Sequence, residues 1–185
     1  HPGALTELTE VLNRSHAFEE LESVMRRLGK AIDGDVEGAE TLHDAAVLAR
    51  RHLGNDGAAL ELLEQSIARN PEDYFSLQRL RDLHVVQQDW DGLCKTLAAM
   101  AELSEGTAKA RTLHQRGRIL SEQLGNDIEG AAALRASREA DPTHAPSFLA
   151  LERLYMRTQN WEELAGIYAG AAANANDADA AFFLA

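Results

Sequence analysis

The chain has 185 residues, with 18 lysines and arginines against 30 aspartates and glutamates, so its formal net charge is −12. Apolar residues make up 45% of the sequence, which is enough for a buried core, and the single cysteine, Cys94, excludes an intrachain disulfide framework. The acidic balance argues against nucleic-acid binding, and no run approaches the ~20 apolar residues of a membrane span, so we predict neither nucleic-acid binding nor membrane insertion.

Apolar residues recur at the spacing of amphipathic helices along the chain, and turn-forming dipeptides separate the helical stretches. In one stretch Leu77, Leu80 and Leu83 have this spacing, and Gly54-Asn55 is one of the breaks. No run alternates with period two for long enough to predict a strand. The expected helices span residues 4–14, 18–31, 36–53, 57–69, 73–86, 90–103, 107–124, 128–140, 144–157 and 161–173.

An internal repeat covers most of the chain. The segment Leu53-Gly54-Asn55-Asp56 recurs as Leu124-Gly125-Asn126-Asp127, and 124 − 53 gives a shift of 71 residues. The same shift relates further pairs, namely His43 and His114, Pro71 and Pro142, Ser76 and Ser147, and Trp90 and Trp161. Each period divides into two helical hairpins of roughly 35 residues, which are expected to pack in series because one hairpin cannot bury its apolar faces alone.

Small and large residues follow one pattern in the second and fourth hairpins. The positions are Ala46, Ala59, Leu63 and Pro71 in the second hairpin and Gly117, Gly130, Leu134 and Pro142 in the fourth. This pattern resembles the tetratricopeptide repeat, as found in the tandem arrays of large bacterial scaffold proteins. The resemblance covers nearly the whole chain, although Arg81 and Glu152 stand where the family usually has small residues. Small residues are expected to let helices approach closely, and large ones such as Trp161 to fill the space between hairpins.

The resemblance implies an all-α fold, a right-handed α-solenoid of about five helical hairpins that winds into a superhelix. We expect a single repeat domain over 1–185, with hairpins at approximately 4–31, 36–69, 73–103, 107–140 and 144–173. The apolar end of the sequence predicts a truncated next repeat at 177–185, which starts a further helix and makes the chain a fragment of a longer protein.

The function that the resemblance implies is a non-enzymatic protein–protein interaction scaffold, which binds a peptide, helix or loop of a partner in a concave groove. The sequence contains no phosphate-binding loop, zinc-protease motif or nucleophile elbow, so no catalytic residue, cofactor or metal is predicted. An alternative is a regulatory or assembly segment of a larger multidomain enzyme whose catalytic domain lies outside this fragment. Self-association through the terminal hairpins also stays open. A cytoplasmic location is expected because no signal-peptide pattern is visible.

Candidate protein-binding residues follow from the register of the resemblance, which places them on the inner face of the expected groove. They are Phe75, Arg79, Arg111, His114, Arg118, Arg153, Met156 and Arg157. The same face includes Val47, Arg50 and Arg51, and His43 and His114 are interpreted as groove-facing polar residues. Guanidinium groups suit carboxylates, so we expect a protein or peptide partner with acidic groups. The alternative is that these arginines pair with acids on adjacent helices.

Overall fold

The computed structural model describes residues 2–174, which form ten α-helices and no strand. The helices are α1 (Pro2–Ser15), α2 (Phe18–Ala31), α3 (Asp35–Leu53), α4 (Asp56–Arg69), α5 (Tyr74–Gln87), α6 (Trp90–Glu102), α7 (Gly106–Glu122), α8 (Asp127–Ala140), α9 (Ala145–Arg157) and α10 (Trp161–Asn174). Each expected helix overlaps one of these, so the all-α class and the order of the elements are confirmed. The further helix expected at 177–185 lies outside the described residues.

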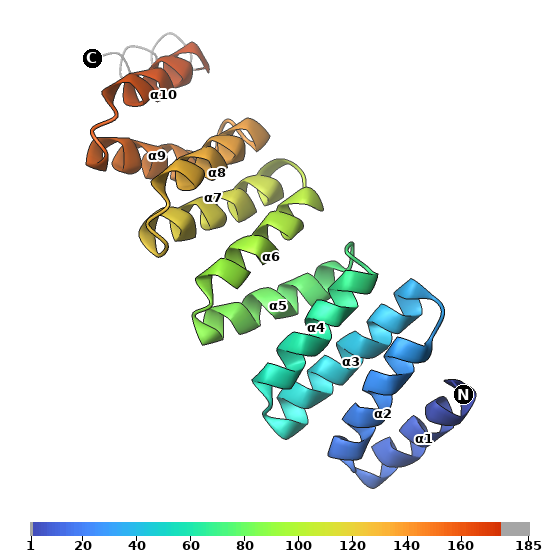
Figure 1. The fold of residues 1–185 in the computed structure, drawn as a ribbon. Helices are drawn as coiled ribbons and strands as arrows, with labels where there is room; N and C mark the ends of the chain where they lie inside the picture. The colour runs from blue at the N-terminus through green and yellow to red at the C-terminus, as the bar shows by residue number, and fades with distance from the viewer. Residues whose placement is uncertain (1, 175–185) are drawn as a thin grey trace. The chain divides into compact units, whose positions relative to one another are not determined.

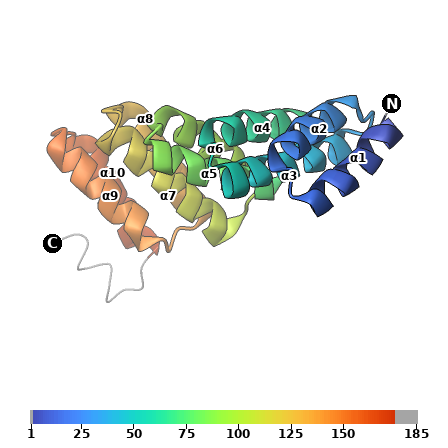
Figure 2. The same cartoon turned by 90° about the horizontal axis from the view of Figure 1, so that it is seen from below.

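The chain divides into two compact units, His1–Ala99 and Met100–Ala185. In the first unit α1 packs against α2, α2 against α3, α3 against α4 and α4 against α5 (Figures 1 and 2). In the second unit α7 packs against α8, α8 against α9 and α9 against α10. Consecutive helices that contact their neighbours in series are the arrangement of a helical solenoid. The single domain over 1–185 stays a prediction.

The two copies of the Leu-Gly-Asn-Asp segment form the same turn, one in each unit. Gly54 and Gly125 have φ values of 61° and 65°, the left-handed conformation that glycine adopts without steric cost. The next residues, Asn55 and Asn126, each accept a hydrogen bond from the backbone N–H three residues on, at 3.0 and 3.2 Å. This side-chain cap starts the following helix. The repeated segment is therefore a combined stop and start signal for helices.

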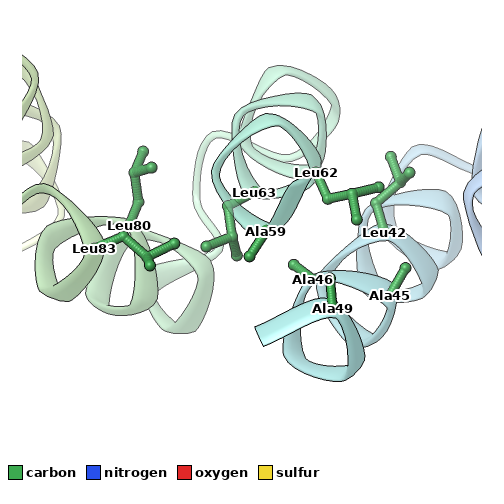
Figure 3. Close-up of a cluster of buried hydrophobic side chains, with 9 residues drawn as sticks. All are labelled: Leu42, Ala45, Ala46, Ala49, Ala59, Leu62, Leu63, Leu80 and Leu83. Carbon is green, nitrogen blue, oxygen red and sulfur yellow. The ribbon is translucent and has the colours of Figure 1, made fainter. Parts of the chain in front are cut away.

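The core of the first unit lies between α3, α4 and α5 (Figure 3). Its members are Leu42, Ala45, Ala46 and Ala49 from α3, Ala59, Leu62 and Leu63 from α4, and Leu80 and Leu83 from α5. Alanines line much of the contact of α3 with α4, where Leu42 and Leu62 also meet, whereas Leu63 and Leu83 fill the space between α4 and α5. This division matches the expected roles of small and large residues.

Helices α7 and α8 of the second unit approach so closely that backbone atoms meet. A Cβ atom added to Gly117 would lie 2.9 Å from the carbonyl oxygen of Gly130 and 2.7 Å from Cγ of Leu134. Leu134 itself is 1% exposed and packs in a cluster with residues of α8, α9 and α10. The expectation that small residues allow this close approach is confirmed.

One packing prediction is wrong. Trp161 is 62% exposed, although the sequence pattern predicts that it fills space between hairpins. The corresponding residue at the start of α2, Phe18, stacks on the ring of His52 at the end of α3, with 4.1 Å between ring centroids. Packing at this position thus comes from the helix after the hairpin, and within the described residues α10 is the last helix.

Candidate protein-binding pocket

A pocket of about 370 Å³ lies between α7 and α9 in the second unit, and we call it the α7–α9 pocket. Its polar lining consists of His114, Arg118, Ser121, Glu122, Arg153 and Arg157. Its apolar lining comes from Pro146, Leu149, Ala150 and Leu154, all on α9. The structure therefore brings four of the eight candidate residues to one cavity, and these are His114, Arg118, Arg153 and Arg157.

The other four candidates lie elsewhere. Phe75 and Arg79 line a smaller pocket of about 220 Å³ between α3 and α5 in the first unit, where Phe75 is 73% exposed, and Arg79 also lines a pocket of about 360 Å³ in that unit. Arg111 and Met156 are exposed and line none of these pockets. A groove shared by all eight residues stays a prediction.

Helical periodicity explains why α7 and α9 present these side chains together. Residues four apart lie on one face of a helix. On α7 this spacing relates His114, Arg118 and Glu122, and on α9 it relates Leu149, Arg153 and Arg157. The neighbouring faces are buried, for example at Leu120 and Leu151, and they fix how the two helices are oriented.

The three arginines of the pocket differ in their partners. Arg118 donates two hydrogen bonds to the carboxylate of Glu122, from Nε at 2.9 Å and from Nη2 at 2.7 Å. Arg157 donates a hydrogen bond to Asp127 of α8. Arg153 is exposed and has no hydrogen bond or ion pair with another described residue. The pairing of arginines with nearby acids thus accounts for Arg118 and Arg157 but not for Arg153.

These charges keep the pocket cationic. The hydrogen bond from Arg118, together with the charges of Arg118, Arg153 and Arg157, holds the pKa of Glu122 below its ordinary value of 4.5. Glu122 is therefore ionised at neutral pH and offsets one of the three guanidinium charges. The lining has an excess of positive charge in a chain whose net charge is −12.

Behind the pocket, a buried hydrogen-bond network joins α7, α8 and α9. The Ser137 hydroxyl donates to the carbonyl of Ala110 at 2.6 Å and lies 2.7 Å from the hydroxyl of Ser147. Two histidines meet the same Ser147 hydroxyl through Nδ1, His144 at 2.8 Å and His114 at 3.2 Å. Because His114 also lines the pocket, the network fixes one of its walls.

The first unit contains the same network 71 residues earlier. Ser66 donates to the carbonyl of Ala39 at 2.8 Å and lies 3.1 Å from Ser76, which meets Nδ1 of His43 at 2.8 Å. Asp73 stands where the second network has a histidine and accepts a hydrogen bond from Ser76 at 2.5 Å. The interpretation of the two equivalent histidines as groove-facing polar residues missed these bonds. The sequence does contain a signal of this network, because the histidine and both serines recur 71 residues later.

Comparison with known proteins shows which other proteins have a similar sequence or fold. Residues 147–179, which include most of α9, match the tetratricopeptide repeat family. A tetratricopeptide repeat protein from Parabacteroides merdae has the same fold, with 14% sequence identity, a TM-score of 0.52, and coverage of 94% of this chain and 66% of that chain. The chain therefore contains a tetratricopeptide repeat at residues 147–179 and shares the fold of tetratricopeptide repeat proteins.

Two structures of MamA also share the tetratricopeptide fold. One has 13% identity and a TM-score of 0.51, covering 88% of this chain and 91% of that chain. Another, designated AMB-1, has 19% identity and a TM-score of 0.52, covering 92% of this chain and 89% of that chain. At these identities the likeness concerns the fold. No curated protein sequence matches the chain.

The titration of His114 predicts that the stability of the second unit depends on pH. Burial, and then the charges of His144 and Arg118, lower the pKa of His114 below its ordinary value of 6.5, against an opposing effect of Glu122. The unfolded chain therefore binds a proton more readily than the folded chain below about pH 6.5. We expect the melting temperature of the second unit to fall as the pH is lowered from about 7.5 to about 5.5.

Thermal unfolding of wild type and His114→Gln across this range checks the pH prediction. The substitution removes the titrating group, so part of the pH dependence should disappear. His43→Gln, which alters the equivalent position of the first unit, is the matched control. An unchanged pH dependence in the His114 variant would show that other groups cause it.

Proposed function

We propose that this chain is a non-enzymatic protein-interaction module and that its α7–α9 pocket binds an acidic peptide segment of a partner protein. The observation that carries the proposal is the exposed guanidinium of Arg153, which has no ion pair with another described residue and lies in a pocket that also contains Arg118 and Arg157. The tetratricopeptide fold supports the general role, because the stacked hairpins of such repeats provide surfaces for other chains.

The chemistry of the lining favours a carboxylate ligand. Arginine presents a planar fork of N–H donors that matches both oxygens of a carboxylate, and the resulting charge-assisted bonds are the stronger class of hydrogen bond. Leu149, which is 46% exposed, and Leu154 offer apolar contacts to the rest of the ligand. Arginines stay protonated, so they bind anions well but transfer no proton, which fits a binding role better than a catalytic one.

The acidic character of the partner follows from Arg153 more than from its neighbours. Arg118 and Arg157 already contact Glu122 and Asp127, so a ligand carboxylate competes with these acids for them. Arg153 forms no hydrogen bond or ion pair with an acid among the described residues, although the charge of Glu122 lies near it. The network of Ser137, Ser147 and His114 holds the two helices of the pocket together without the ligand, which limits the ordering cost of binding.

Binding of a labelled peptide tests the proposal. The probes are a fluorescent peptide of alternating glutamate and serine and a copy with glutamine in place of glutamate. We expect Arg153→Gln to weaken binding of the acidic peptide about tenfold, which corresponds to about 1.4 kcal/mol for one charge-assisted contact. Arg27→Gln, which removes one positive charge from α2 in the first unit, is the matched control and should leave the affinity unchanged.

The salt dependence distinguishes the outcomes. Binding through an exposed arginine should weaken as the ionic strength rises. Equal affinities for the acidic and the amide peptide, or an affinity that Arg153→Gln leaves unchanged, would contradict an acidic ligand in this pocket.

The compartment and the oligomeric state stay predictions. Among the described residues, no helix is both long and apolar enough to cross a membrane. Self-association through the terminal hairpins at the two ends of the chain also stays a prediction.

A further inference from the structure

The first unit has a pocket at the positions that correspond to the α7–α9 pocket, and we call it the α3–α5 pocket. It has a volume of about 360 Å³ and is lined by residues of α3, α4 and α5. Val47 corresponds to Arg118 by the shift of 71 residues, and Leu83 corresponds to Leu154. The duplication has therefore produced two related cavities.

The side chains at corresponding positions differ in a way that changes the chemistry. Val47 stands where the other pocket has an arginine, and Arg51 stands where it has Glu122. Arg79 takes the place of an alanine. Among the described residues, the lining of the α3–α5 pocket thus contains three arginines and no carboxylate, the third arginine being Arg50.

Two of these three arginines have no partner among the described residues. Arg50 forms an ion pair with Asp56 at 3.5 Å. Arg51 and Arg79 are both exposed, and neither has a hydrogen bond or an ion pair with another residue of the described chain. Acids are not scarce, since the sequence has 30 acidic residues against 18 basic ones. The two guanidinium groups are therefore available to a ligand.

The floor between these arginines is apolar. Ala46, Ala59, Leu63 and Leu83 line the pocket and are at most 2% exposed. Val47 lies beside them on α3 and is half-buried. The apolar floor and the unpaired arginines favour a ligand that carries an apolar side chain next to carboxylates. The apolar side chain is then removed from water, and each carboxylate is paired with a guanidinium group.

We propose that the α3–α5 pocket is a second protein-binding site, which takes a peptide segment in which a leucine- or phenylalanine-sized side chain lies next to aspartate or glutamate. The apolar side chain contacts the floor at Val47, and the carboxylates bind Arg51 and Arg79. The site goes beyond the function proposed for the α7–α9 pocket, because it lies in the other unit and selects for an apolar residue as well as for charge.

Selection from a random library of 12-residue displayed peptides tests this second site. The bait is the full chain carrying Arg153→Gln, which removes the acid contact of the other pocket. We expect enriched sequences with leucine, isoleucine or phenylalanine next to aspartate or glutamate. An enriched peptide, synthesised with a fluorescent label, should bind at least tenfold more weakly when Arg51→Gln and Arg79→Gln are added to the bait. Neither side chain is part of the buried core, and circular dichroism of the variant is the check that it is folded.

A second variant tests the apolar part of the site without removing a charge from the protein. Val47→Arg introduces the residue found at the corresponding position of the other pocket and covers the apolar floor. This substitution should weaken binding of the enriched peptide at least tenfold. A copy of the peptide with serine in place of the apolar residue should bind poorly to every form of the protein.

Three results would overturn the second site. The first is a library selection that yields no such motif, and the second is an affinity that the two arginine substitutions leave unchanged. The third is a change in the oligomeric state of the chain on these substitutions, which would show that a second copy of the chain occupies the pocket. Failure of the function proposed for the α7–α9 pocket appears separately, as an unchanged affinity of the purely acidic peptide for Arg153→Gln.

Discussion

Truncation of Leu134 to alanine is expected to lower the free energy of unfolding of the second unit by about 2–5 kcal/mol. Leu134 is 1% exposed and packs in one cluster with Leu151, Leu154 and Tyr155 of α9. The substitution removes buried apolar surface and leaves a cavity between α7, α8 and α9, which rigid helix backbones fill only in part. Urea unfolding followed by circular dichroism measures the change.

Leu63→Ala is the matched control for this prediction. Leu63 corresponds to Leu134 by the shift of 71 residues and is 2% exposed in the first unit. Because hairpins of a solenoid contact mainly their neighbours, hydrogen exchange should increase around α7–α9 in the Leu134 variant and around α3–α5 in the Leu63 variant. A uniform increase over the whole chain in both variants would contradict this local effect.

Replacement of Gly130 by valine is expected to lower the free energy of unfolding by about 1–3 kcal/mol. A Cβ atom at Gly130 would lie 2.9 Å from Cβ of Ser121 and 3.0 Å from the carbonyl oxygen of Gly117. Backbone atoms cannot rotate out of the way, so α7 and α8 have to move apart. In the first unit Ala59 occupies the corresponding position, so a single methyl group is tolerated there. Valine is larger than alanine and therefore tests the close approach of the helices more stringently.

Gly57→Ala separates crowding from the general effect of replacing a helical glycine. Among the described residues, the atom within 4 Å of a Cβ at Gly57 belongs to the Asn55 side chain, at 3.6 Å, which is an ordinary contact. Alanine in a helix is more favourable than glycine by up to about 1 kcal/mol, so this variant should be as stable as the wild type or slightly more stable. A Gly130 variant as stable as the wild type would show that α7 and α8 have room for a side chain.

The helical hairpins and their turns could be predicted because their causes are local. Gly54 and Asn55 end one helix and start the next through their own conformation and hydrogen bonds, and their copies 71 residues later do the same. Apolar spacing along the sequence then decides which helix faces are buried. For the same reason the face that carries Arg118 and Arg153 could be assigned.

Contacts between helices distant in the sequence could not be predicted, because they depend on how whole elements pack. The pair of Arg118 and Glu122 is readable as an i, i+4 spacing, but Arg157 and Asp127 are 30 residues apart. Arg69 donates hydrogen bonds to backbone carbonyls at the end of α2, including that of Ile32 at 2.8 Å. No sequence pattern predicts this contact. The exposure of Trp161 is likewise decided by contacts between helices, which its position in the repeat pattern does not specify.

Chemical-shift mapping with the acidic peptide tests most directly the claim that the α7–α9 pocket binds a partner segment. Amide and arginine side-chain resonances of the isotopically labelled chain are followed during titration with the glutamate–serine peptide. We predict that the largest changes occur at Arg153, Arg118 and Leu149 and that Arg153→Gln abolishes them. Changes confined to the faces of α8 and α10 that lie outside the pocket, or no changes at all, would contradict the account.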